Sequence, residues 1–218
     1  SARWGITFFA ANTYEAVLVP ILADFHPESV NSLVDHSESK VLLTDTDIWN
    51  KLDITKMPTV QAVFSSSDFS LLYASDEKIQ KACDELDQLF EAKYPDGFSA
   101  EHVSYPTGND KELAIINYTS GTTSAPKGVM LRYECLSENV AFGQKRLPTG
   151  PGDTIVSMLP MAHMYGMMFE LIYPVCNGAS VYYLGKTPTP ALLLGAMKEV
   201  KPYLVITVPL VMEKIFKS

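Results

Sequence analysis

The stretch of the sequence with the clearest chemical potential is YTSGTTSAPKGV, residues 118–129. It holds two glycines and one lysine, and four of its hydroxyl side chains lie between residues 120 and 124. Such hydroxyls compete with the backbone for hydrogen bonds, and Pro126 has no amide hydrogen to donate to a strand ladder, so the stretch is predicted to be a loop. Small residues admit close approach of backbone amides, hydroxyls donate, and a lysine adds positive charge. Together these groups suit a bound phosphate.

The Walker A loop, GxxxxGK[ST], also binds phosphates, but the stretch departs from that pattern. After Gly121 the lysine comes only at position 127, and Gly128 follows it in place of the serine or threonine that holds magnesium. A conventional phosphate-loop NTPase is therefore disfavoured. A surface loop with no ligand is the other interpretation of so many hydroxyls. A buried strand, ELAIINY at 112–118, precedes the loop, and open α/β sheets bind ligands at the carboxyl ends of their strands.

This stretch and a second one resemble motifs of the adenylate-forming (AMP-binding) superfamily. YTSGTTSAPKGVML resembles the phosphate-binding motif of acyl-CoA synthetases, firefly-type luciferases and peptide-synthetase adenylation domains, although Ser124 stands where the family usually has glycine. LPMAHMYGMMFE, residues 159–170, resembles the family's next motif, and its AH-x6-E form is most similar to long-chain fatty-acid–CoA ligases. FFAANTYEAVLVPI and FHPESVNSLVDHSESKVLLTD are similar to the early part of the large N-terminal domain. The chain is therefore identified as a truncated piece of that domain.

The resemblance implies roles for particular residues. Those expected around the β- and γ-phosphates of ATP are Thr119, Ser120, Gly121, Thr122, Thr123 and Lys127. Thr119 is also expected to approach Mg²⁺. The residues expected to border the carboxylate and the start of the acyl pocket are His163, Tyr165 and Gly166. Taken alone, this histidine would be a hydrogen-bonded core histidine and the nearby methionines would be core packing, whereas in a pocket methionines suit a flexible apolar chain.

The function implied by the resemblance is ATP-dependent activation of a long-chain fatty acid to an acyl-adenylate and then to acyl-CoA. ATP, Mg²⁺ and coenzyme A would take part. The YGxTE-like motif, the ribose-binding aspartate and the C-terminal domain with its lysine are not found in the sequence. We therefore expect the 218 residues alone to have no ligase activity and the parent protein to be an active acid–thiol ligase. The alternatives are adenylation of an aryl, medium-chain or amino acid, and a non-catalytic nucleotide-binding module.

Alternating strand-like and helix-like segments are expected to position these motifs. Strand patterns occur at 16–21, 40–45, 59–64, 112–118, 153–159, 179–184 and 203–208, and helix patterns at 4–16, 27–37, 76–93, 133–145, 165–174, 190–199 and 209–217. This order predicts an α/β fold with mostly parallel sheets flanked by helices. Two segments are expected, 1–105 with a polar linker and 106–218 with the phosphate-binding loop, and region 65–105 carries no motif that assigns it a role.

Composition limits the classes of partner. The 218 residues include 17 basic and 25 acidic ones, a net charge of -8, and no run of lysine or arginine, so nucleic-acid binding is not expected. Three scattered cysteines, Cys83, Cys135 and Cys176, favour free thiols in a cytoplasmic protein over disulfides or a zinc site. No apolar run reaches the roughly 18 residues of a transmembrane helix, which leaves peripheral contact with a membrane open. The sequence does not fix the oligomeric state.

Overall fold

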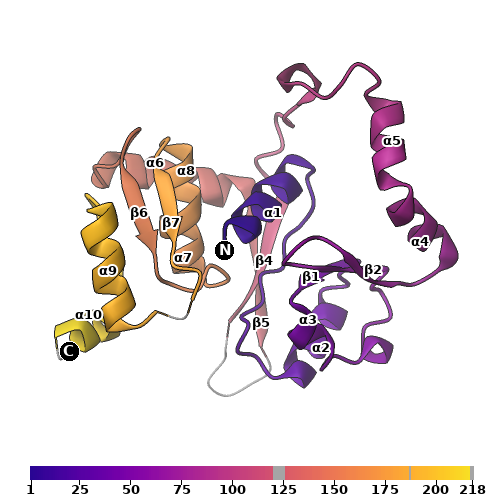
Figure 1. The fold of residues 1–218 in the computed structure, drawn as a ribbon, viewed down its shortest axis with the longest axis horizontal. Helices are drawn as coiled ribbons and strands as arrows, with labels where there is room; N and C mark the ends of the chain where they lie inside the picture. Colours follow the sequence, from indigo (N-terminus) through magenta and orange to yellow (C-terminus); the bar gives the residue numbers. More distant parts are fainter. Residues whose placement is uncertain (120–125, 187, 217–218) are drawn as a thin grey trace.

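The computed structural model describes residues 1–119, 126–186 and 188–216, and its strands form three small sheets (Figure 1). The strands are β1 (Val41–Thr44), β2 (Ala62–Ser65), β3 (Leu71–Ala74), β4 (Leu113–Thr119), β5 (Lys127–Arg132), β6 (Thr154–Ser157) and β7 (Ser180–Tyr183). The pairs β1–β2 and β6–β7 are parallel, whereas β2–β3 and β4–β5 are antiparallel. The expected α/β class is confirmed, and the strand directions within it are mixed.

Helices flank these sheets, and most of the longer ones begin and end close to the predicted positions, whereas the short helix at 46–49 was not predicted. They are α1 (Ala2–Thr13), α2 (Pro27–His36), α3 (Thr46–Trp49), α4 (Glu77–Asp84), α5 (Leu86–Lys93), α6 (Tyr133–Arg146), α7 (Met164–Met167), the π-helical turn η3 (Met168–Ile172), α8 (Tyr173–Cys176), α9 (Pro190–Val200) and α10 (Pro209–Phe216). Short 3₁₀ turns are η1 (Ile54–Lys56) and η2 (Ala100–His102). Two of the longer helices, α2 and α9, begin at a proline, whose fixed φ suits the first helical position. No helix in the described part of the chain is long and apolar enough to cross a bilayer.

Helices cover both faces of the β6–β7 sheet. Neighbouring residues of a strand point to opposite faces, and β6 shows this directly. Val156 packs with Leu193 and Ala196 of α9, while the next residue, Ser157, bonds to Glu170 in η3. Figure 1 shows the β4–β5 hairpin between this sheet and the β1–β3 sheet. The hairpin therefore lies at the centre of the molecule.

The largest core joins the beginning of the chain to its second half. Phe8 of α1 packs in one cluster with Ala114 and Ile115 of β4 and with Leu171 and Tyr173. Burial of a large apolar side chain such as Phe8, Ile115 or Leu171 contributes about 1.5–3 kcal/mol of hydrophobic stabilisation. The two predicted segments thus share a core through α1, and the proposed division after residue 105 stays a prediction.

Region 76–93 was predicted as one amphipathic surface helix, and the structure has two helices there. The break falls at Glu85, whose φ and ψ of -96° and 8° depart from helical values. Neither α4 nor α5 has a buried residue, and the pair extends away from the rest of the molecule (Figure 1). The surface location is therefore confirmed, but the single helix is wrong.

Two predicted strands do not form among the described residues. Segment 203–208 pairs with no described strand, and segment 16–21 contributes one parallel bridge, between Leu18 and Ile115. A strand requires a neighbouring edge that supplies its hydrogen bonds, so apolar, β-branched composition is not sufficient. The strands β3 and β5, which the sequence interpretation missed, form because each follows a partner and folds back on it.

Candidate functional site

The predicted phosphate-binding stretch connects the two strands of the β4–β5 hairpin. Thr119, the last residue of β4, pairs directly with Lys127, the first residue of β5, and both are exposed. Directly opposed residues of an antiparallel pair place their side chains on the same face, with Cβ atoms about 4.5–5.5 Å apart. The structure therefore brings the first and last of the predicted phosphate ligands together. The other four, Ser120, Gly121, Thr122 and Thr123, lie outside the described residues.

The end of β4 is held from both sides. Asn117 is buried, and its Nδ2 donates to the carbonyl of Ala162 at 3.2 Å. The adjacent Tyr118 points to the other face, where its hydroxyl lies 2.7 Å from His36 Nδ1 at the end of α2. Burial raises the pKa of the Tyr118 phenol, so the hydroxyl stays protonated. These contacts fix the strand end that presents Thr119, and they join it to the second motif.

Lys127 is not neutralised by a carboxylate of the described chain. The ion pairs found there are Lys81–Glu85 and Arg132–Glu134, and both lie elsewhere. An exposed, unpaired ammonium at the end of a hairpin can pair with an anion without first breaking an internal salt bridge. The position therefore suits the charge role that the sequence predicts for this lysine.

The second motif forms a turn, 158–163, followed by α7. His163 caps this helix, because its Nδ1 accepts a hydrogen bond from the amide of Tyr165 at 3.3 Å. Its Nε2 has no hydrogen-bond partner among the residues that the structure describes. The histidine and Tyr165 are both exposed, which excludes the alternative of a core histidine. Gly166 is buried, and a Cβ there would lie 2.6 Å from the carbonyl oxygen of Pro160, so a side chain would displace the turn.

An apolar cavity of about 310 Å³ opens beside His163. One wall comes from β5 and α6 and the other from the second motif, and the lining residues are Leu131, Cys135, Leu136, Asn139, His163, Met164, Tyr165, Met168 and Phe169. Of the methionines in the second motif, Met164 and Met168 line the cavity, while Met167 lies in the buried core without reaching it. The cavity is large enough for part of a flexible apolar ligand.

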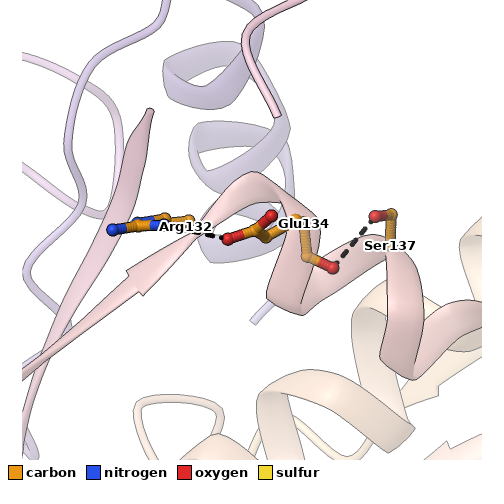
Figure 2. A network of polar contacts seen from close by, with 3 residues as sticks. All are labelled: Arg132, Glu134 and Ser137. Carbon is orange, nitrogen blue, oxygen red and sulfur yellow. Dashed lines mark hydrogen bonds and ion pairs between the residues drawn. The ribbon is translucent and has the colours of Figure 1, made fainter. Parts of the chain in front are cut away.

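The connection from β5 to α6 sets the position of the first wall. Figure 2 shows Arg132 at the end of β5 beside Glu134, with 3.2 Å between Nη1 and Oε1, and Ser137 Oγ donating to the carbonyl of Glu134 at 3.0 Å. An exposed pair of this kind contributes about 1 kcal/mol or less. Its effect is mainly local, since it fixes the turn from which α6 leaves toward the cavity.

Glu170, the last residue of the second motif, was given no role by the sequence interpretation. It is fully buried, with 0% of its surface exposed. Its Oε2 accepts hydrogen bonds from Ser157 Oγ at 3.2 Å, from the amide of Met158 at 3.0 Å and from the amide of Leu159 at 2.8 Å. Burial raises the pKa of this carboxyl to about 7, against the lowering effect of the three donors. The signal that could have identified it is an acid in the apolar run MMFELIY.

The Glu170 carboxyl makes the stability of the fold depend on pH. Its folded pKa of about 7 exceeds the ordinary value of 4.5, so the folded state binds the proton more tightly than the unfolded state. The stabilisation is complete below about pH 4.5 and is lost as the pH rises through 7, by about 3 kcal/mol in total. Urea unfolding at pH 5 and pH 8 should show this fall, and Glu170→Gln should remove it. A wild-type-minus-variant difference that is flat or rises with pH contradicts the prediction.

A magnesium ion is expected from the first motif, and the structure allows a test of fit. No group of three or more acidic, histidine or cysteine side chains in the described ranges could hold a metal ion. Mg²⁺ in nucleotide sites is commonly held by one or two carboxylates together with the phosphates. The described residues therefore do not form a magnesium site by themselves, and the assignment of Thr119 to this ion stays a prediction.

Comparison with known proteins identifies similarity along the whole chain. The model of the family AMP-binding enzyme matches residues 1–218. The chain is 28% identical to the long-chain-fatty-acid–CoA ligase ACSBG2 of Homo sapiens over 218 residues, which cover 99% of this chain and 32% of that protein. It spans about a third of the length of the curated relatives it matches.

Solved structures show the same fold at lower sequence identity. The long-chain-fatty-acid–CoA ligase FadD1 from Archaeoglobus fulgidus has a TM-score of 0.77 at 20% identity, covering 100% of this chain and 40% of that one. ATP-bound MatB from Rhodopseudomonas palustris has a TM-score of 0.76 at 18% identity, covering 100% and 39%. With a family model that matches every residue, the conclusion is direct: the chain belongs to the AMP-binding enzyme family.

Proposed function

We propose that this chain is the part of an ATP-dependent acid–CoA ligase that holds the triphosphate and admits the carboxylic acid, and that the acid is a long-chain fatty acid. The observation that carries the proposal is the Asn117–Ala162 hydrogen bond of 3.2 Å. It joins the end of the phosphate hairpin to the turn that carries His163. The bond would keep the proposed nucleotide site next to the apolar cavity, as the reaction of ATP with an apolar acid requires.

The first half-reaction would be attack of the acid's carboxylate oxygen on the α-phosphorus of ATP, which releases pyrophosphate. The phosphate ligands would be Thr119, Ser120, Gly121, Thr122, Thr123 and Lys127, and their task is to position the leaving group and balance its charge. His163, Tyr165 and Gly166 would border the carboxylate. In the second half-reaction the sulfur of coenzyme A attacks the acyl carbon and AMP leaves. The 218 residues contain no site that we assign to this step.

The cavity supports an acid with a flexible apolar tail. Its lining is mainly apolar, and thioether side chains adapt to irregular shapes. Its volume of about 310 Å³ lies at the lower end of ligand sites, so it would hold the part of the chain next to the carboxyl group. The cysteines are free thiols in the structure, which favours a reducing compartment such as the cytoplasm.

Pyrophosphate exchange by the full-length protein tests both the reaction and the acid. Labelled pyrophosphate should enter ATP in the presence of a sixteen-carbon fatty acid, and to a smaller extent with medium-chain, aryl or amino acids. Leu136→Trp, which fills the cavity, should lower kcat/KM for the sixteen-carbon acid by about tenfold or more, because overpacking excludes the tail. Leu194→Trp, at an exposed position of α9, is the matched control. Preference for another acid class would reassign the substrate, and no exchange with any acid would favour a non-catalytic nucleotide-binding module.

A further inference from the structure

We propose that Glu170 is a positioning residue for the acid: it fixes the turn 158–163 and thereby sets where His163 stands at the cavity. The proposal rests on the function proposed above and adds a residue to it. Glu170 does not line the cavity, so it would act through the turn and not through contact with substrate.

The hydrogen bonds of Glu170 are placed where the strand ladder ends. β6 pairs with β7 only as far as Ser157, so the amides of Met158 and Leu159 lie beyond the last paired residue. Both amides donate to the same carboxyl oxygen, at 3.0 and 2.8 Å. Backbone amides that are buried without an acceptor cost about 1–3 kcal/mol each. The carboxyl therefore determines the direction in which the chain leaves the strand.

The helix that carries Glu170 is shaped to deliver this side chain. Pro174 has no amide hydrogen, and in a regular helix its ring would clash with the carbonyl four residues earlier, which is that of Glu170. The helix accommodates this with the π-helical turn η3, at whose centre Glu170 lies. π-Helical turns alter the direction of side chains and recur at functional sites. A regular helix would present residue 170 at a different angle.

The rest of the turn is fixed to neighbours, so a shift at its start would reach His163. Gly166 packs closely under the carbonyl of Pro160, the amide of His163 donates to that same carbonyl at 3.0 Å, and Ala162 accepts from Asn117. Glu170 supplies the one carboxylate among these described contacts. Its second oxygen, Oε1, is buried and has no hydrogen-bond partner among the described residues, so the contact depends on Oε2 alone.

Two variants separate the reach of this side chain from its charge. Glu170→Gln keeps an oxygen at the same distance but removes the charge, whereas Glu170→Asp keeps the charge but is shorter by one methylene group. In hydrogen exchange on the full-length protein, the amides of 158 and 159 should keep their protection within about threefold in the Gln variant. In the Asp variant, the protection of these two amides against exchange should fall by about 10- to 100-fold. The amides of β1 serve as an internal reference. Equal protection in the Asp variant and wild type, or equal loss in both variants, overturns the proposal.

Kinetics add a readout that a general loss of stability would not move. In pyrophosphate exchange, Glu170→Asp should raise KM for the fatty acid or lower kcat by about tenfold or more, because a misplaced group near the substrate is costly. KM for ATP should stay within about twofold of the wild-type value. In Glu170→Gln, kcat and KM for the fatty acid should stay close to the wild-type values. Equal changes in the KM values of ATP and acid overturn the positioning role. A wild-type protein that exchanges with no acid while the amide pattern holds refutes the proposed function and leaves the anchoring of the turn established.

Discussion

Replacing Lys127 by alanine in the full-length protein is expected to lower the proposed pyrophosphate exchange by about 100-fold, with most of the loss in kcat. The lysine begins β5 directly opposite Thr119, is exposed, and is paired with no carboxylate in the described part of the chain. In the proposed reaction, attack on the α-phosphorus would leave negative charge on the departing pyrophosphate, and an ammonium group already in place would stabilise that charge without reorganisation. Exchange of labelled pyrophosphate into ATP at saturating fatty acid measures the effect.

A matched control lies beyond the opposite end of the same β4–β5 hairpin. Lys111 is exposed in the turn before β4 and takes part in no ion pair within the described ranges. Lys111→Ala changes the net charge as much as Lys127→Ala. If the position of the lysine determines the effect, and not the net charge, Lys111→Ala should leave the exchange rate within about twofold of wild type. Equal losses in the two variants would mean that the general field of the protein, and not the hairpin, acts on the nucleotide. An unaffected Lys127→Ala would remove this residue from the phosphate site.

At the first motif, the sequence predicted one strand of the hairpin and not the other. The strand predicted at 112–118 is β4 with a shift of one residue, because an unbroken apolar run between polar ends has few other solutions. Its antiparallel partner β5 was missed. KGVMLR has charged ends, a glycine and four exposed residues, so it carries little strand signal of its own. It is a strand because β4 supplies the paired edge, and sequence periodicity does not contain that information.

The second motif shows a similar limit for side-chain roles. His163, Tyr165 and Gly166 were predicted to border the substrate carboxylate. The first two line the cavity and Gly166 does not, and their contact with a substrate stays a prediction. The hydrogen bonds of Glu170 could not be predicted, because they run to backbone amides that become free only where β6 ends. The close approach of Gly166 to Pro160 likewise depends on the path of the turn. Residue types indicated the chemistry here, whereas tertiary contacts determine the residues that support it.

Replacing Tyr173 by alanine is expected to lower the free energy of unfolding by about 4 kcal/mol, which is a large part of the stability of an ordinary domain. Tyr173 is fully buried, and its ring fills the space above Gly143 of α6, where a Cβ would lie 2.4 Å from Cδ2. Its hydroxyl donates to the carbonyl of Leu147 at 2.6 Å and accepts from Thr149 Oγ1 at 2.5 Å. The ring and the hydroxyl together attach α6 and the segment after it to α8.

This attachment holds the two walls of the cavity together, since α6 carries Leu136 and the helix that leads into Tyr173 carries Met168. In the full-length protein, Tyr173→Ala should therefore raise KM for the proposed long-chain acid even at temperatures where the protein stays folded. Tyr173→Phe keeps the ring and should cost only about 1–3 kcal/mol, the cost of leaving the Leu147 carbonyl without its donor. Tyr203→Ala, at a tyrosine that is 69% exposed, should stay within about 0.5 kcal/mol in urea unfolding. If Tyr173→Ala and Tyr203→Ala destabilise equally, the helix α6 is held by other contacts and the cavity does not depend on this ring.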